Sequence, residues 1–180
     1  MNLELVLENI KVKEYHGDRN KFISGISDNS LDVKSGCLFF AVKGNIVDGH
    51  NFIIDAINGG CEVIVCTELP SLLDKKITYV IVENIRESIS TISSNFYKNP
   101  SKEIKIICVT GTNGKTSIVY FLHQFFSNLN IKVGMLSTIE NIINDEVLET
   151  NLTTPSSILI NKLLRKMVSN NCKICLMEAS

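Results

Sequence analysis

Residues 104–116 join an apolar run to a glycine-containing turn and a Lys-Thr pair, reading Ile-Lys-Ile-Ile-Cys-Val-Thr-Gly-Thr-Asn-Gly-Lys-Thr. The apolar run is typical of a buried strand, and the amphipathic stretch 115–129 is typical of a helix. Glycines let the backbone curl so that successive N–H groups point at phosphate oxygens, and the helix start adds the positive end of its dipole. The plainer alternative is a glycine turn followed by a chance Lys-Thr pair. The order strand, turn, helix favours a phosphate-binding loop.

Two side chains of this loop carry specific chemistry. Lys115 is expected to reach the β- and γ-phosphates of a nucleotide, and the Thr116 hydroxyl is expected to bind Mg²⁺. Only two residues, Thr112 and Asn113, separate the glycines, so the loop departs from the common G-x-x-x-x-G-K-[ST] spacing. From the residues alone, the prediction is Mg²⁺-nucleotide phosphoryl chemistry.

The chain alternates short apolar runs with longer amphipathic stretches, which predicts an α/β fold with largely parallel sheets. Strands are expected at 37–42, 61–66, 78–82, 104–109, 133–137 and 174–177, and helices at 48–58, 84–97, 115–129 and 155–168. The last helix is expected to take Thr154 as N-cap and Pro155 in its first turn. A polar link at Asn99-Pro100 predicts a boundary between a module at 1–100 and a second one at 101–180. Because the sequence stops just after a strand, the second module is expected to be incomplete.

The charge balance excludes several classes of partner. The formal net charge is -1, from 18 Lys+Arg and 19 Asp+Glu, so no broad positive field is available for nucleic acid or an anionic membrane. The sequence has neither a membrane-spanning run nor a secretory signal, which predicts a cytoplasmic protein. Its six cysteines show no framework spacing, and reduced, buried thiols are expected. The pair Cys172 and Cys175 has the spacing of a redox or zinc pair, but no second pair follows it.

Several blocks of the sequence resemble the Mur ligase family. Residues 109–116 are similar to the ATP loop of Mur ligases and of their folylpolyglutamate synthetase relatives. Residues 36–41, 44, 48–50 and 52 are similar to the uridine-nucleotide domain of the members that extend UDP-N-acetylmuramoyl-L-alanyl-D-glutamate by one amino acid. Residues 136–139, 153–155 and 177–180 look like central-domain motifs of those members. The resemblance implies an N-terminal uridine-nucleotide-binding module followed by the first part of a P-loop NTPase-like parallel-sheet domain.

The resemblance also implies roles for single residues. The ATP phosphates would be bound by Gly111, Thr112, Asn113, Gly114, Lys115, Thr116 and Ser117, with Lys115 as the catalytic residue. Mg²⁺ would be held by Thr116 and Glu178, and the UDP-muramoyl peptide would contact Ser30, Thr153, Thr154 and Ser180. Without the resemblance, Glu178 is an ordinary strand-end acid and Thr153-Thr154-Pro155 an ordinary helix start. Asn29-Ser30-Leu31 stands where the family commonly has Asp-Ser-Arg. The expected uridine pocket therefore lacks the arginine, whose guanidinium group could donate two parallel hydrogen bonds.

The implied activity is ATP-dependent amide formation in peptidoglycan precursor synthesis. A diamino acid, diaminopimelate or lysine, would be added to the UDP-N-acetylmuramoyl dipeptide through an acyl phosphate. The 180-residue chain alone is expected to be inactive, because the family continues with the rest of the ATPase domain and a domain that binds the incoming amino acid. Two other classes stay open: a nucleotide-binding switch that uses the same loop, and a non-catalytic truncated remnant.

Overall fold

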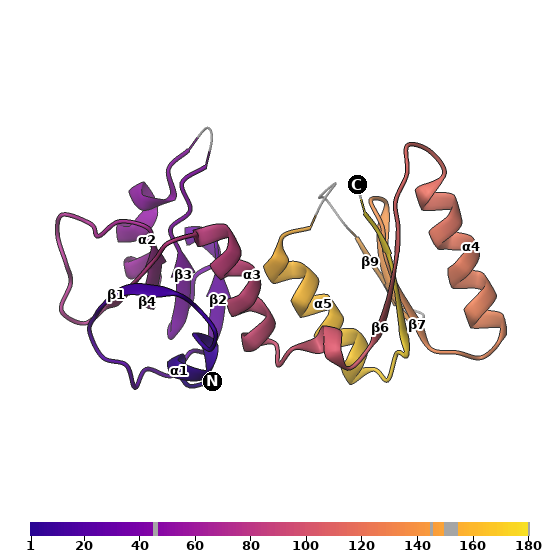
Figure 1. The fold of residues 1–180 in the computed structure, drawn as a ribbon, viewed down its shortest axis with the longest axis horizontal. Helices are drawn as coiled ribbons and strands as arrows, with labels where there is room; N and C mark the ends of the chain where they lie inside the picture. Colours follow the sequence, from indigo (N-terminus) through magenta and orange to yellow (C-terminus); the bar gives the residue numbers. More distant parts are fainter. Residues whose placement is uncertain (45–46, 145, 150–154, 180) are drawn as a thin grey trace. The chain divides into compact units, whose positions relative to one another are not determined.

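The computed structural model describes residues 1–44, 47–144, 146–149 and 155–179. The chain divides into two compact units, Met1–Phe96 and Tyr97–Ser180. Each unit contains a five-stranded sheet with helices packed against it (Figure 1). Among the described residues, no helix has both the length and the apolar character to cross a membrane.

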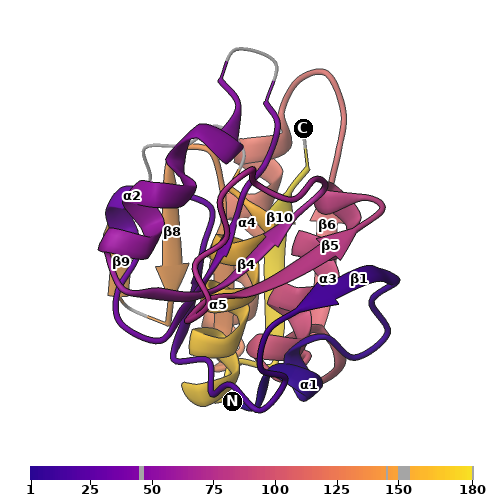
Figure 2. The same cartoon turned by 90° about the vertical axis from the view of Figure 1, so that its left-hand side faces the viewer.

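The first unit is built around a mostly parallel sheet of order β1-β5-β4-β3-β2. Its elements are α1 (Leu3–Val6), β1 (Val12–His16), β2 (Gly25–Ser27), the 3-10 turn η1 (Ser30–Asp32), β3 (Cys37–Phe40), η2 (Gly49–Phe52), α2 (Ile53–Asn58), β4 (Cys61–Cys66), β5 (Thr78–Val82) and α3 (Ile85–Phe96). Strands β2 to β5 pair in parallel, and β1 pairs antiparallel with β5. Figure 2 shows β4 and β5 running side by side in one direction.

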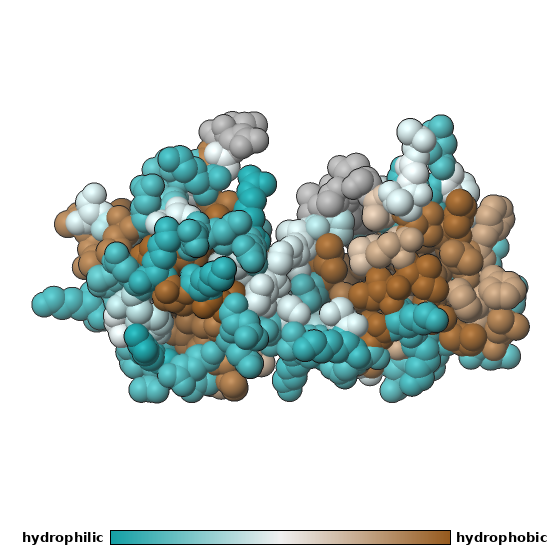
Figure 3. Space-filling model, viewed as in Figure 1, coloured by the Kyte–Doolittle hydropathy of each residue, from teal (hydrophilic) through white to brown (hydrophobic). Residues whose placement is uncertain are grey.

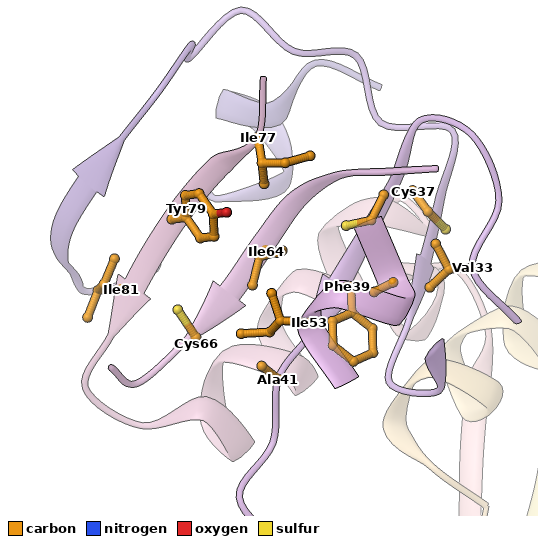
Figure 4. Packing of buried hydrophobic residues seen from close by; sticks show 12 residues of the cluster. Val33, Cys37, Phe39, Ala41, Ile53, Ile64, Cys66, Ile77, Tyr79 and Ile81 are labelled. Carbon is orange, nitrogen blue, oxygen red and sulfur yellow. The ribbon is translucent and has the colours of Figure 1, made fainter. Parts of the chain in front are cut away.

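The central strands of this sheet are buried on both faces, because helices lie on either side of it (Figure 1). Strands covered on both faces are apolar at nearly every position, which explains the continuous apolar runs in the sequence. On the face covered by α2, Phe39, Ile53, Ile64 and Tyr79 pack together (Figure 4). Helix α3 buries Ile85, Ile89 and Ile92 along one stripe.

The second unit contains the glycine turn for which the sequence predicts phosphate binding, between β6 and α4. Its elements are η3 (Pro100–Lys102), β6 (Lys105–Val109), α4 (Lys115–Asn128), β7 (Val133–Leu136), β8 (Glu140–Ile143), β9 (Glu146–Glu149), α5 (Ser157–Ser169) and β10 (Ile174–Glu178). The strand order is β6-β10-β7-β8-β9, with β10 parallel to both β6 and β7 and with antiparallel β7–β8 and β8–β9 pairs. The carboxyl ends of β6, β10 and β7 therefore meet at one edge of the sheet.

Helices α4 and α5 cover opposite faces of this second sheet (Figure 1). Under α4, Val119 packs against Val133, Met135 and Leu176. Under α5 lies a separate cluster that includes Leu163, Leu164, Met167 and Cys175. The outer face of α4 stays apolar and exposed, at Ile118, Phe121, Phe125 and the following Leu129 (Figure 3).

The structure corrects several expectations about local structure. The helix expected at 155–168 begins at Ser157, and its N-cap is Ser156, whose hydroxyl accepts a hydrogen bond from the Leu159 N–H at 3.3 Å. Pro155 precedes the helix, and Thr154 lies outside the described residues. The helix expected at 48–58 begins as η2, because the Asp48 carboxylate accepts from the His50 N–H at 3.0 Å and so caps a tighter turn first. The sequence did not predict strands β1, β2, β8 and β9, and three of the four pairings that these strands make in the described sheets are antiparallel.

All six cysteines are free thiols. Cys37, Cys61, Cys66, Cys172 and Cys175 are buried as expected, and burial raises the pKa of Cys175 to about 12. The expectation is wrong for Cys108, which is exposed. Cys108 lies near the carboxyl end of the edge strand β6, on the same face as Ile106, but it is not part of the cluster packed under α5.

Candidate functional site

The turn between β6 and α4 has the backbone geometry that its glycines predict. Gly111 has φ 147 and Gly114 has φ 78, conformations that L side chains rarely adopt. Gly114 is the N-cap of α4, and no side chain caps the helix there. A Cβ added at Gly114 would meet nothing within 4 Å, so the space beside the loop is open. The loop therefore presents uncapped helix N–H groups to an accessible space, as an anion site requires.

Lys115 folds back over its own loop. Its Nζ donates hydrogen bonds to the Gly111 carbonyl at 2.7 Å and to the Thr112 carbonyl at 3.4 Å. Both acceptors are neutral, and a phosphate oxygen is a stronger, charged acceptor. The Lys115 ammonium group therefore lies at the loop, where it could exchange its two carbonyl acceptors for phosphate oxygens.

Thr116 and Glu178 come together although they lie 62 residues apart in the chain. Glu178 is the last residue of β10 and pairs with Val109, the last residue of β6, so its side chain lies at the carboxyl edge of the sheet. The Thr116 hydroxyl lies 3.1 Å from both Glu178 oxygens. Two residues that the sequence predicted as metal ligands thus lie in direct contact beside the phosphate loop.

This pair of oxygen ligands has the chemistry that Mg²⁺ favours. A carboxylate and a hydroxyl are hard ligands, and Mg²⁺ in nucleotide sites commonly takes one or two protein oxygens and completes its shell with phosphate and water oxygens. Among the described residues there is no group of three His, Cys, Asp or Glu side chains that could hold a metal by itself. The residues present fit Mg²⁺ brought in with nucleotide phosphates, and they do not fit a metal held by protein alone.

Thr138 is a member of this cluster that the sequence reasoning did not single out. It follows β7, and both its N–H and its hydroxyl lie within hydrogen-bond distance of Glu178 Oε2, at 3.3 and 3.2 Å. The sequence marks residues 136–139 only through their resemblance to a Mur ligase motif. The signal that locates Thr138 is topological: a polar residue two positions after the end of a parallel strand lies at the same edge of the sheet as the glycine loop.

The first unit holds Ser30, the predicted uridine-pocket residue, in η1. The preceding Asn29 caps this turn, with its side-chain oxygen accepting from the Leu31 N–H at 3.1 Å and its amide donating to Asp32 at 2.9 Å. Leu31 is 89% exposed. A large apolar side chain is therefore held in solvent at the position where an arginine was expected.

The block 48–50 of the first unit is locally constrained. Gly49 donates a backbone hydrogen bond to Val42 at 2.8 Å, and a Cβ there would lie 2.5 Å from the Val42 carbonyl oxygen, so only glycine fits. His50 contributes both its backbone N–H and its ring, whose Nδ1 lies 2.7 Å from Asp48, and these hydrogen bonds lower the pKa of the Asp48 carboxyl. The block fixes the start of α2.

Three predicted substrate residues, Thr153, Thr154 and Ser180, lie outside the described residues. The structure therefore groups Gly111 to Ser117 with Glu178 in the second unit and places Ser30 in the first.

Two family profiles match consecutive parts of the chain. Residues 22–106 match the profile described as "Mur ligase family, catalytic domain", and residues 109–180 match "Mur ligase middle domain". Among similar proteins, the UDP-N-acetylmuramoyl-L-alanyl-D-glutamate–2,6-diaminopimelate ligase of Phocaeicola vulgatus is 39% identical over 180 residues. The protein of the same name from Cytophaga hutchinsonii is 40% identical over 181 residues. Both alignments cover 100% of this chain but only 37% of the relative, so the chain spans little more than a third of their length.

Solved structures share the fold. A UDP-N-acetylmuramoyl-L-alanyl-D-glutamate–2,6-diaminopimelate ligase superposes with a TM-score of 0.79 at 18% identity, over 100% of this chain and 36% of the other. MurF from Acinetobacter baumannii gives 0.69 at 21% identity, over 98% of this chain and 35% of the other. MurF ligase from Thermotoga maritima, solved in complex with ADP, gives 0.56 at 22% identity, over 85% and 31%.

Proposed function

The chain belongs to the Mur ligase family, and on that basis we propose that it supplies the uridine-nucleotide module and the phosphate loop of an ATP-dependent amide ligase. The proposed reaction joins 2,6-diaminopimelate to UDP-N-acetylmuramoyl-L-alanyl-D-glutamate, which are the substrates in the names of its relatives. Lysine is the alternative diamino acid. The proposed place of action is the cytoplasm.

The observation that carries this proposal is the contact of Thr116 with Glu178 beside an open glycine loop. A phosphate loop alone is compatible with many nucleotide-binding proteins. The same loop, with a hydroxyl in the first turn of α4 and a carboxylate at the end of β10, also provides oxygen ligands for the Mg²⁺ that accompanies ATP. Phosphoryl transfer needs both parts.

In the proposed reaction, the D-glutamyl carboxylate attacks the γ-phosphorus of ATP, which gives an acyl phosphate and ADP. The amine of the diamino acid then attacks the acyl carbon, and inorganic phosphate leaves. Lys115 would exchange its carbonyl partners at Gly111 and Thr112 for phosphate oxygens, and the loop N–H groups would hold those oxygens in line. Mg²⁺, when bound by Thr116 and Glu178, would supply charge neutralisation at the phosphates.

The first unit is proposed to bind the uridine nucleotide, with Ser30 as a contact. Because exposed Leu31 offers no charged hydrogen bonds, the uridine diphosphate would rely on backbone and neutral side-chain donors in this region. Thr153, Thr154 and Ser180 remain proposed contacts of the muramoyl peptide.

The test uses a ligase of the relatives' length that carries this segment, with Lys115→Ala compared against Lys162→Ala. Lys162 is an exposed lysine on α5, away from the loop in sequence, and serves as the matched control. Lys115→Ala should leave ATP affinity only modestly weaker, because the backbone cradle remains. Turnover should fall about 10²–10³-fold, because a charge that stabilises the transition state is lost. Lys162→Ala should change neither.

A second variant tests the metal ligands. Thr116→Ala should raise the Mg²⁺ concentration that gives half-maximal rate, because one oxygen ligand is gone. The 180-residue chain alone should form no ligated product. Near-normal turnover in Lys115→Ala would require the phosphate-loop assignment to be withdrawn.

A further inference from the structure

The two oxygens of the Glu178 carboxylate have unequal partners. Oε2 lies near three donors: the Thr116 hydroxyl at 3.1 Å, the Thr138 N–H at 3.3 Å and the Thr138 hydroxyl at 3.2 Å. In the described part of the chain, Oε1 has only the Thr116 hydroxyl, also at 3.1 Å. Since a hydroxyl carries one proton, Thr116 donates to one oxygen at a time. Oε2 therefore keeps two donors from Thr138 whichever way the Thr116 hydroxyl turns.

Thr138 is held in place by the turn that contains it. The buried Ser137 hydroxyl donates to the Glu140 carbonyl at 2.8 Å and accepts from the N–H groups of Ile139 and Glu140 at 3.3 and 3.2 Å. These hydrogen bonds close the turn between β7 and β8 on itself. The position of the Thr138 backbone is thus set independently of Glu178.

The same turn is fastened to the helix that carries Thr116. Tyr120, one helical turn after Thr116 on α4, donates its hydroxyl to the Glu140 carboxylate. A closed circuit results: Thr116 contacts Glu178, Glu178 contacts Thr138, and the turn of Thr138 returns through Glu140 to Tyr120 on the same helix. A carboxylate in such a circuit has little freedom to rotate.

We propose that Thr138 is a positioning residue that fixes Oε2 of Glu178, so that Oε1 is left to bind a divalent cation together with Thr116. This inference rests on the proposed function, because it needs a cation at Thr116 and Glu178. Mg²⁺ demands a strict ligand geometry, and residues that orient a metal ligand through hydrogen bonds commonly matter for affinity almost as much as the ligand. Thr138 acts through Glu178 and does not itself contact the cation.

The test measures Mn²⁺ binding by the 180-residue chain in the presence of the non-hydrolysable β,γ-imido analogue of ATP. Free Mn²⁺ is followed by electron paramagnetic resonance, so no ligase activity is needed. The variants are Glu178→Gln, Thr138→Val and Thr138→Ser, with Thr91→Val on α3 of the first unit as the matched threonine control. Valine keeps the shape and the N–H of Thr138 and removes the hydroxyl, whereas serine keeps the hydroxyl.

Thr138→Val should raise the Kd for Mn²⁺ about tenfold, the lower end of the effect of losing such a hydrogen bond, because one donor remains. Thr138→Ser and Thr91→Val should bind Mn²⁺ as the unaltered chain does. In Thr138→Val, nucleotide affinity measured in EDTA and the thermal midpoint of unfolding should be unchanged. A merely structural role of Thr138 predicts that both would fall. Should Thr138→Val fail to fold, Thr138→Ala is judged by the same readings.

Two results separate failure of the inference from failure of the proposed function. If Glu178→Gln weakens Mn²⁺ binding but both Thr138→Val and Thr138→Ala bind normally, the positioning role is wrong and the metal site stands. If the unaltered chain binds no Mn²⁺ with the analogue, or Glu178→Gln binds as well as the unaltered chain, the metal site is wrong and the inference falls with it.

Discussion

Replacing Gly134 by alanine should destabilise the second unit through a clash with a single side chain. Gly134 lies in β7, paired with Cys175 on one side and Ile143 on the other. A Cβ there would lie 2.4 Å from the sulfur of Met167 and 2.6 Å from its terminal methyl, and Met167 on α5 is 0% exposed. Carbon and sulfur at van der Waals contact are more than about 3.5 Å apart, so the methionine must move by roughly 1 Å within a packed core.

The size of the effect follows from two opposing contributions. Overpacking of this kind costs about 1–3 kcal/mol, whereas alanine reduces the entropy of the unfolded chain and returns about 0.4–1 kcal/mol. The clash should win, with a net loss of about 1–2 kcal/mol. For a unit of this size, that loss corresponds to a fall in Tm of about 4–16 °C.

A double-mutant cycle identifies the cause. Met167→Ala alone should cost about 2–5 kcal/mol, because it leaves a cavity. In that background Gly134→Ala should cost nothing or stabilise, since its methyl enters vacated space. Urea unfolding gives the free energies, and hydrogen exchange of peptides from β7, β10 and α5 assigns them to the second unit. An equal cost of Gly134→Ala in both backgrounds would refute the reasoning. Gly114→Ala is the control: it meets no atom, should lose about 1–2 kcal/mol through its positive φ, and should not couple to Met167.

Three further outcomes are expected. Residues 1–96 expressed alone should unfold cooperatively, and limited proteolysis of the whole chain should leave a fragment ending near Pro100; loss of cooperativity in 1–96 would count against an independent first unit. Under native conditions Cys108 should react with a thiol reagent well before the five buried cysteines, and in urea all six should react alike; equal native rates would contradict the burial pattern. Burial raises the pKa of Tyr15 and of Tyr120 to about 12, and Glu140 adds to the effect at Tyr120. Because unfolded tyrosines ionise near pH 10, the stability that these two contribute is complete below about pH 10 and is lost as the pH rises toward 12. Absorbance titrations of tyrosinate in the folded and the urea-unfolded chain should show this difference in pKa.

The buried centre of each sheet could be predicted from the sequence, and the edges could not. Strands β4 and β5 begin and end where their apolar runs do, because burial on both faces leaves no polar position to blur the pattern. Strand β1 reads Val-Lys-Glu-Tyr-His and is mostly exposed, so it has no apolar run that would mark it as a strand. Strand β1 pairs with β5, which lies more than 60 residues later in the chain, and local sequence patterns do not predict such distant pairings.

The candidate site also has one part that could be predicted from the sequence and one part that could not. The glycine loop and the Lys-Thr pair are contiguous, and their local chemistry could be recognised in the sequence. The approach of Glu178 to Thr116 depends on β10 pairing beside β6, which the resemblance suggested and composition could not. The role of Thr138 depends on a turn whose hydrogen bonds are made by Ser137 and Tyr120, and such a network becomes visible only in three dimensions.

The strand order β6-β10-β7 has a consequence for how the chain emerges from a ribosome. Of the strands in the second sheet, β10 is synthesised after all the others, yet it occupies the place between β6 and β7. At about 5–20 residues per second, the 62 residues from Thr116 to Glu178 take roughly 3–12 s to make. During those seconds β6 lacks β10, its one neighbour in the described sheet, and α4 has no complete surface to cover. A nascent chain can therefore expose the glycine loop for seconds before Glu178 is made, so the proposed phosphate and metal sites are completed at separate moments of synthesis.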